Sequence, residues 1–149
     1  MKTKIFLIGA RGLLGSNIVQ SDSKKYSFFE GYNKTLGNFN KSNSIKIDIT
    51  KFEDCKKILK IDPDIIIHTA AITDVDYCEQ NKKKTYSVHV LGTKNLCKIA
   101  KKLNCKIIYI STDGIFSGNR TNYKEDDVTK PLNYYGKTKL EAENEIKKL

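Results

Sequence analysis

The 149-residue sequence has no tryptophan, one methionine and two prolines, and it lacks any long apolar run. A membrane-spanning helix needs about 20 consecutive apolar residues, and no stretch approaches that length. The short apolar segment after Lys2 and Lys4 runs into glycines instead of a cleavage site of small residues. We interpret it as a buried strand and not as a signal peptide. We therefore expect a cytoplasmic protein that does not contact a membrane.

Patterns typical of disulfides and metal sites are also missing. The cysteines form no C-x-x-C pair and have no histidine at metal-ligand spacing; they are Cys55, Cys78, Cys97 and Cys105. We expect reduced thiols and no metal site. The two histidines, His68 and His89, have no evident serine or cysteine nucleophile as a partner, so we expect both to pack or to form hydrogen bonds.

Acidic residues are few relative to basic ones, with 17 Asp and Glu against 27 Lys and Arg and a net charge of +10. A protein that binds nucleic acid usually gathers its positive charge on one face or in one tail. Here the lysines are spread over every expected helix and loop, so we expect no nucleic-acid partner. The length and the 39% of hydrophobic residues suit one domain with a proper core, over residues 1–149.

Short apolar runs alternate with segments of helical periodicity. The expected strands are Lys4–Ile8, Tyr26–Tyr32, Ser44–Ile47, Ile65–Ile67 and Lys106–Ile110. The expected helices start near Gly12, cover Lys51–Lys60 behind a capping box of Thr50 and Glu53, and cover Lys84–Leu103 and Asn133–Leu149. Such alternation indicates an α/β protein with a Rossmann-like, doubly wound parallel sheet of about five strands. Right-handed crossovers favour the strand order 3-2-1-4-5.

The first expected strand leads directly into GARGLLG at residues 9–15, which then opens a helix. Glycines Gly9, Gly12 and Gly15 allow a tight turn and a close approach of the backbone to a pyrophosphate. The start of the helix supplies unpaired N–H donors and the positive end of its dipole. In this context the motif predicts a dinucleotide-binding domain.

Two more segments end strands where a Rossmann-type sheet has its ligand groove. Asp48 and Ile49 follow the third strand, and the Asp48 carboxylate can accept a hydrogen bond from an adenine amino group. The segment 69–71 follows the fourth strand, where the small side chains of Ala70 and Ala71 allow close approach of a cofactor.

The choice between NAD and NADP depends on the end of the second strand. An acidic residue there favours NAD, but Glu30 stands two residues before the expected end. Arg11 and Lys34 can both meet a 2′-phosphate, so we expect NADP(H) to be favoured over NAD(H).

Tyr135 and Lys139 lie four residues apart on an expected helix and hence on one face. An ammonium beside a phenol stabilises the phenolate, so this tyrosine can exchange a proton with a carbonyl or alcohol oxygen. Thr112 ends the fifth strand and can bind the same oxygen. Ser111 competes with Thr112, and Tyr134 with Tyr135, but only Tyr135 has a lysine four residues later.

With these residues assembled, the chain resembles the extended short-chain dehydrogenase/reductase superfamily, and within it the dTDP-4-dehydrorhamnose reductase branch. The matching segments span the chain: GARGLLG (9–15), DIT (48–50), HTAAITDVDYCE (68–79), LGTKNL (91–96), ISTDGIF (110–116) and PLNYYGKTKLE (131–141). The resemblance implies reduction of the 4-keto group of a nucleotide-linked deoxysugar by NAD(P)H, with Thr112, Tyr135 and Lys139 as the catalytic set. It implies a cofactor lining of Gly9, Arg11, Gly12, Leu13, Leu14, Asp48, Ile49, Ala70, Ala71 and Thr73. Tyr135 and Lys139 are also expected to contact the cofactor, with Lys139 holding the nicotinamide ribose. A homodimer is possible.

The chain departs from that family at three points. His89 stands where members usually have Asn, Gly114 stands where Tyr is frequent, and members are nearly twice as long. The second half normally completes the sheet and grips the sugar nucleotide, so we expect this chain to bind NADP(H) with little turnover alone. The alternatives are another epimerase or dehydratase of the superfamily, or a non-catalytic binding subunit like a relative that regulates methionine adenosyltransferase.

Overall fold

A computed structural model describes residues 2–22, 24–34 and 43–149. Five strands form one parallel sheet in the order β3-β2-β1-β4-β5, which confirms the predicted fold class and strand order. The strands are β1 (Lys4–Ile8), β2 (Ser27–Tyr32), β3 (Ser44–Lys46), β4 (Ile65–His68) and β5 (Lys106–Tyr109). Each lies within two residues of its expected bounds at either end, because buried apolar runs between polar turns mark strands clearly.

The register brings the carboxyl ends of three strands to one edge of the sheet. Ile8, the last residue of central strand β1, pairs with Gly31 on one side and with His68 on the other. The segments that leave β1, β2 and β4 therefore start side by side. This edge is where open α/β sheets bind ligands.

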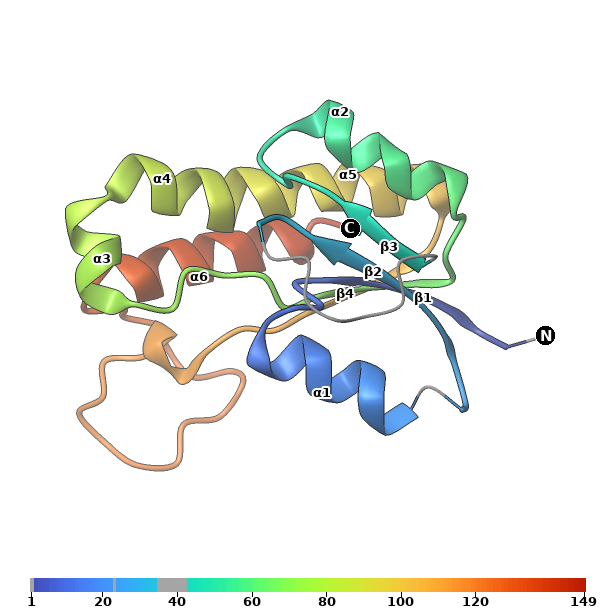
Figure 1. Ribbon diagram of the computed structural model, residues 1–149. Helices are drawn as coiled ribbons and strands as arrows, with labels where there is room; N and C mark the ends of the chain where they lie inside the picture. Colours follow the sequence, from blue (N-terminus) through green and yellow to red (C-terminus); the bar gives the residue numbers. More distant parts are fainter. Residues whose placement is uncertain (1, 23, 35–42) are drawn as a thin grey trace.

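Helices cover both faces of the sheet (Figure 1). They are α1 (Leu13–Asp22), α2 (Phe52–Cys55), α3 (Val75–Gln80), α4 (Lys82–Tyr86), α5 (Gly92–Leu103) and α6 (Tyr134–Ile146). Helix α1 lies on one face, and α2, α5 and α6 lie on the other. Among the described residues, no helix is both long enough and apolar enough to cross a membrane.

The capping box expected at Thr50 and Glu53 is wrong. The backbone N–H and the hydroxyl of Thr50 both donate to Asp48 Oδ1, at 3.1 and 2.7 Å. Helix α2 instead starts after Lys51 without a side-chain cap, and the segment Lys56–Lys60 that follows is a 3₁₀ helix. The helix therefore begins one residue later than a cap at Thr50 requires, with Lys51 at the N-cap position.

The long helix expected over Lys84–Leu103 starts earlier and is not regular. It runs from Lys82 through α4, a π-helical turn at Ser87–Leu91, and α5. Helix α3 before it was not predicted. Helix α6 agrees with its expected bounds to within three residues at its carboxyl end, and the Asn133 side chain caps its start.

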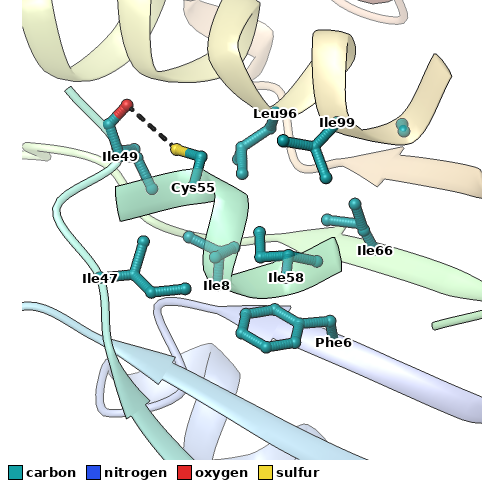
Figure 2. Packing of buried hydrophobic residues seen from close by; sticks show 10 residues of the cluster. Phe6, Ile8, Ile47, Ile49, Cys55, Ile58, Ile66, Leu96 and Ile99 are labelled. Carbon is teal, nitrogen blue, oxygen red and sulfur yellow. Dashed lines mark hydrogen bonds between the residues drawn. The ribbon is translucent and has the colours of Figure 1, made fainter. Parts of the chain in front are cut away.

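The main hydrophobic core lies between the sheet and the helices of one face. Figure 2 shows isoleucines of the strands and of the segment after β3 packed against α5 and the α2 region. The cluster contains Phe6, Ile8, Ile47, Ile49, Cys55, Ile58, Ile66, Leu96, Ile99 and Ala100. The apolar side of α5 is thus buried within the molecule, and a homodimer through this helix stays a prediction.

Candidate coenzyme groove and active site

A groove of about 560 Å³ opens at the carboxyl ends of the strands. Its walls come from the turn after β1, the end of β2, the loop after β4, and helices α3 and α4. The lining residues are Gly9, Gly12, Asn33, Lys34, Thr69, Ala70, Ala71, Ile72, Asp74, Tyr77, Lys84 and Val88. Five predicted site residues meet here, from three separate segments: Gly9, Gly12, Lys34, Ala70 and Ala71.

The turn between β1 and α1 needs glycine for steric reasons. Gly9 has a φ of +84°, and a Cβ there would lie 2.7 Å from Ala70 N, in the loop after β4. A Cβ on Gly15 would lie 2.8 Å from Ala10 Cα and closer still to Gly9 O. The turn therefore packs tightly on its neighbours, and the amino end of α1 is left open to a ligand.

Leu13 and Leu14, expected to contact the cofactor, lie in the first turn of α1. Their side chains are 87% and 46% exposed. Apolar side chains at the open start of a helix, next to a glycine turn and a groove, suit a bound dinucleotide. On these observations the residues present fit a nicotinamide coenzyme.

Asp48 and Ile49 lie in the segment after β3 but are not among the residues that line the groove. Asp48 Oδ1 is engaged by Thr50, and Ile49 is buried beneath Gly92, where a Cβ would lie 2.6 Å from the Ile49 side chain. The Asn95 amide donates to Ile49 O at 2.9 Å and fixes this corner. Thr73 also lies outside the lining, next to Asp74, which belongs to it.

Arg11 does not point freely into the groove. Its guanidinium forms an ion pair with Glu30 at 3.1 Å, and both side chains are 7% exposed. Arg11 also donates to Ser44 Oγ at 2.7 Å and lies over the Tyr32 ring. Glu30 stands two residues before the end of β2, as expected, and balances the charge of Arg11 inside the protein.

Several groove residues were not predicted as site residues, and two of them, Asp74 and Tyr77, were missed because helix α3 was missed. Its sequence signal is Asp74, whose side chain accepts from Tyr77 N at 2.9 Å as an N-cap. Asp74, Tyr77, Lys84 and Val88 complete the wall opposite the glycine turn.

Thr112 and Tyr135 meet at Gly114, close to the end of β5. A Cβ on Gly114 would lie 3.3 Å from Thr112 Oγ1 and 3.9 Å from Tyr135 Cε1. The competing residues face elsewhere: Ser111 donates to Glu143 at 3.0 Å, and Lys82 lies over the Tyr134 ring. A Cβ on Gly136 would clash with Gly114 O, so α6 lies directly against this turn.

Lys139 lies one turn after Tyr135 on α6 and is only 3% exposed. Its ammonium donates to Ile110 O and lies 4.2 Å from the centre of the Tyr109 ring. Burial lowers the pKa of Lys139 from 10.5 to about 8, and Glu143 partly opposes this shift. The lysine is therefore mainly protonated at pH 7, at an energetic cost to the fold.

We expect Lys139→Met to raise the free energy of unfolding at pH 7 by roughly 2 kcal/mol. The native protein releases the Lys139 proton near pH 8, whereas the unfolded chain holds it to about pH 10.5. The wild type therefore gains stability as the pH rises between these values. The gap in unfolding free energy between Lys139→Met and the wild type becomes smaller. Urea unfolding at pH 7, 9 and 10 measures this, with exposed Lys137→Met as the control. A gap that does not change with pH would contradict the expectation.

Both histidines are buried and hydrogen-bonded, as expected. His68 Nε2 lies 3.1 Å from Thr93 Oγ1, and His89 lies between Ile72 and Thr138. Burial, followed by the nearby charge of Lys139, lowers the pKa of His68 to about 3 and that of His89 to about 4. Both imidazoles are neutral at physiological pH.

The model of a protein family described as RmlD substrate binding domain matches residues 3–149. Methionine adenosyltransferase 2 subunit beta of Xenopus tropicalis is 34% identical over 148 residues, covering 96% of this chain and 42% of that protein. A dTDP-4-dehydrorhamnose reductase of Mycolicibacterium smegmatis is 31% identical over 148 residues, covering 98% of this chain and 42% of that protein.

Among solved structures, dTDP-4-dehydrorhamnose reductase from Bacillus anthracis in complex with NADP aligns with a TM-score of 0.87 and 31% identity. The alignment covers 100% of this chain and 50% of that one. The chain thus spans half of this structure and less than half of the curated relatives that it matches.

Proposed function

Since the chain belongs to the RmlD substrate binding domain family, we propose that it forms the coenzyme-binding and catalytic part of a sugar-nucleotide reductase. The reaction is the reduction of the 4-keto group of a nucleotide-linked deoxysugar by NAD(P)H. One observation carries the proposal: Thr112 and Tyr135 both approach the position that a Cβ on Gly114 would occupy, with Lys139 one turn further along α6. This set stands on the same sheet edge as a groove built by a glycine turn.

In this reaction each residue has a separate task. A bound NAD(P)H supplies the hydride. Tyr135 gives its phenolic proton to the substrate oxygen, and Thr112 binds that oxygen by a hydrogen bond. Lys139 supplies a positive charge one turn along α6 from Tyr135, and its task is to hold the coenzyme ribose. Gly9, Gly12 and Gly15 let the backbone approach the pyrophosphate.

A second hollow, of about 650 Å³, adjoins the proposed catalytic residues. Gly114, Tyr123 and Leu132 are among its lining residues, and Leu132 is 70% exposed. The Phe116 and Tyr123 rings stack at 4.5 Å along the same loop. In this proposal the sugar nucleotide approaches from this side.

The proposed coenzyme is NADP(H) in preference to NAD(H). Because Glu30 neutralises Arg11, the cation at the end of β2 that lines the groove is Lys34. We expect Lys34→Glu to weaken NADPH binding about tenfold while NADH binding changes less than about threefold. Lys84→Glu, a charge reversal elsewhere on the groove, is the matched control. Equal losses for both coenzymes in the Lys34 variant would contradict the assignment.

The direct test of the proposal is an assay for NADPH oxidation with dTDP-linked and UDP-linked 4-keto sugars. We expect slow turnover that depends on the 4-keto group. The assay is repeated with this chain joined to a sugar-nucleotide-binding domain. If that protein binds the coenzyme but reduces no 4-keto sugar, the result counts against the reductase and for the second candidate below.

A second candidate is a coenzyme-binding subunit without chemistry of its own. It is favoured by similarity to methionine adenosyltransferase 2 subunit beta, with 34% identity over 148 residues. The arrangement of Thr112, Tyr135 and Lys139 argues for the reductase, because a binding role alone does not require all three.

A further inference from the structure

We propose that His89 is a positioning residue that holds the groove loop after β4 at a fixed place relative to the catalytic helix α6. The proposal rests on the proposed function, since it concerns the geometry between coenzyme and proton donor. His89 lies in the π-helical turn between α4 and α5 and is 1% exposed. Such turns occur frequently at functional sites.

Two short hydrogen bonds connect the His89 ring to different segments. The Ile72 N–H donates to Nε2 at 2.9 Å, and Nδ1 lies 2.8 Å from Thr138 Oγ1. Ile72 follows Ala70 and Ala71 in the groove wall. Thr138 lies on α6 directly before Lys139.

The donor in each of these hydrogen bonds can be assigned by counting the hydrogens on the Thr138 hydroxyl and the His89 ring. The Thr138 hydroxyl has one hydrogen and donates it to a backbone carbonyl of α6, with Tyr134 O at 3.0 Å and Tyr135 O at 2.9 Å. It must therefore accept from His89, so Nδ1 carries the proton. Nε2 is then free to accept from Ile72. Only this neutral tautomer satisfies both partners.

The same ring also contacts the proposed proton donor. The His89 and Tyr135 rings meet edge to face, with centroids 5.7 Å apart and an angle of 80°. One buried side chain thus touches the groove loop, the Thr138 hydroxyl of α6 and the Tyr135 ring. The two hydrogen bonds that connect Ile72, His89 and Thr138 are called the His89 tie below. Because the coenzyme would rest on the loop, the tie fixes the coenzyme relative to the phenol.

Two substitutions separate the two ends of the tie. In His89→Asn the side-chain amide can donate near the position of Nδ1, to Thr138, but it cannot reach Ile72. In His89→Gln the side-chain carbonyl can accept from Ile72, but the donor to Thr138 is lost. Both changes should lower stability. Calorimetric titration with NADPH should show about tenfold weaker binding for His89→Asn and less than about threefold for His89→Gln.

Thr138→Val removes the helix end of the tie from the other side. It should behave like His89→Gln in NADPH binding, and Thr85→Val is the same change at another fully buried threonine. Equal losses of affinity in the Asn and Gln variants, or no loss in either, would overturn the proposal, because stability alone would then account for the results.

Absence of NADPH binding by the folded wild type would count against the proposed function and leave the tie itself testable. Long-range ¹H–¹⁵N spectra at pH 7 should then show Nδ1 protonated and Nε2 unprotonated. Hydrogen exchange of the Ile72 amide should be faster in His89→Asn than in His89→Gln. The opposite tautomer, or equal exchange, would overturn the proposal.

Discussion

Gly15→Ala is expected to destabilise the protein by about 3 kcal/mol or more and to abolish coenzyme binding. Gly15 lies in α1, where alanine would ordinarily be favoured by about 1 kcal/mol. Here a Cβ would lie 2.8 Å from Ala10 Cα and closer still to Gly9 O, and neither backbone atom can move without opening the turn. Urea unfolding and calorimetric titration with NADPH measure the two effects.

Gly12→Ala is the matched control for stability. At Gly12 the nearest atom to a Cβ is Gly9 O at 3.3 Å, so the free energy of unfolding should change by less than about 1 kcal/mol. Similar stability losses in the two variants would mean that the close packing of the turn on α1 does not explain the effect of Gly15.

Tyr135→Phe is expected to lower the rate of 4-keto reduction by about 10²- to 10⁴-fold, because it removes the group that gives the proton. NADPH affinity should change less than about twofold, since the lost hydroxyl is not required to hold the coenzyme. Stopped-flow oxidation of NADPH under single-turnover conditions measures the rate even where steady turnover is slow.

Tyr134→Phe provides the control at the neighbouring position. The Tyr134 ring lies beneath Lys82, on the side of α3 and α4, so both rate and affinity should stay unchanged. If Tyr135→Phe reduced the ketone as fast as the wild type, Tyr135 would not be the proton donor, and the assignment of its role would be contradicted.

The strands and their order could be predicted because the signals are local. Lys4–Ile8 and Ile65–His68 are short apolar runs that end at polar or glycine-rich turns, and parallel connections allow few orders. The glycine turn and the Tyr135–Lys139 pair also depend on spacing within one segment. Such features can be found without knowing the tertiary packing.

The features that escaped prediction depend on contacts between distant segments or on weak local signals. The pairing of β2 with β1 places Glu30 opposite Leu7, near the end of β1. Glu30 can therefore pair with Arg11, which lies in the turn that follows β1. Helix α3 has only six residues, and its Asp74 cap is a modest signal. The π-helical turn and the two partners of His89 appear only when three elements are assembled.

The capping box failed for a different reason. A threonine followed three residues later by a glutamate suits a cap, yet Thr50 can also donate to an aspartate two residues before it. In the structure Thr50 donates to Asp48, and the helix starts one residue later than the pattern predicts, with Lys51 at the N-cap position. The pattern alone does not fix the residue at which the helix starts.

The central claim, that this chain holds a nicotinamide coenzyme at the carboxyl edge of its sheet, is tested most directly by calorimetric titration with NADPH and NADH. Heat is the suitable signal because the protein has no tryptophan. We expect one equivalent of coenzyme to bind, with NADPH bound more tightly than NADH. No binding of either coenzyme by protein shown to be folded would contradict the claim.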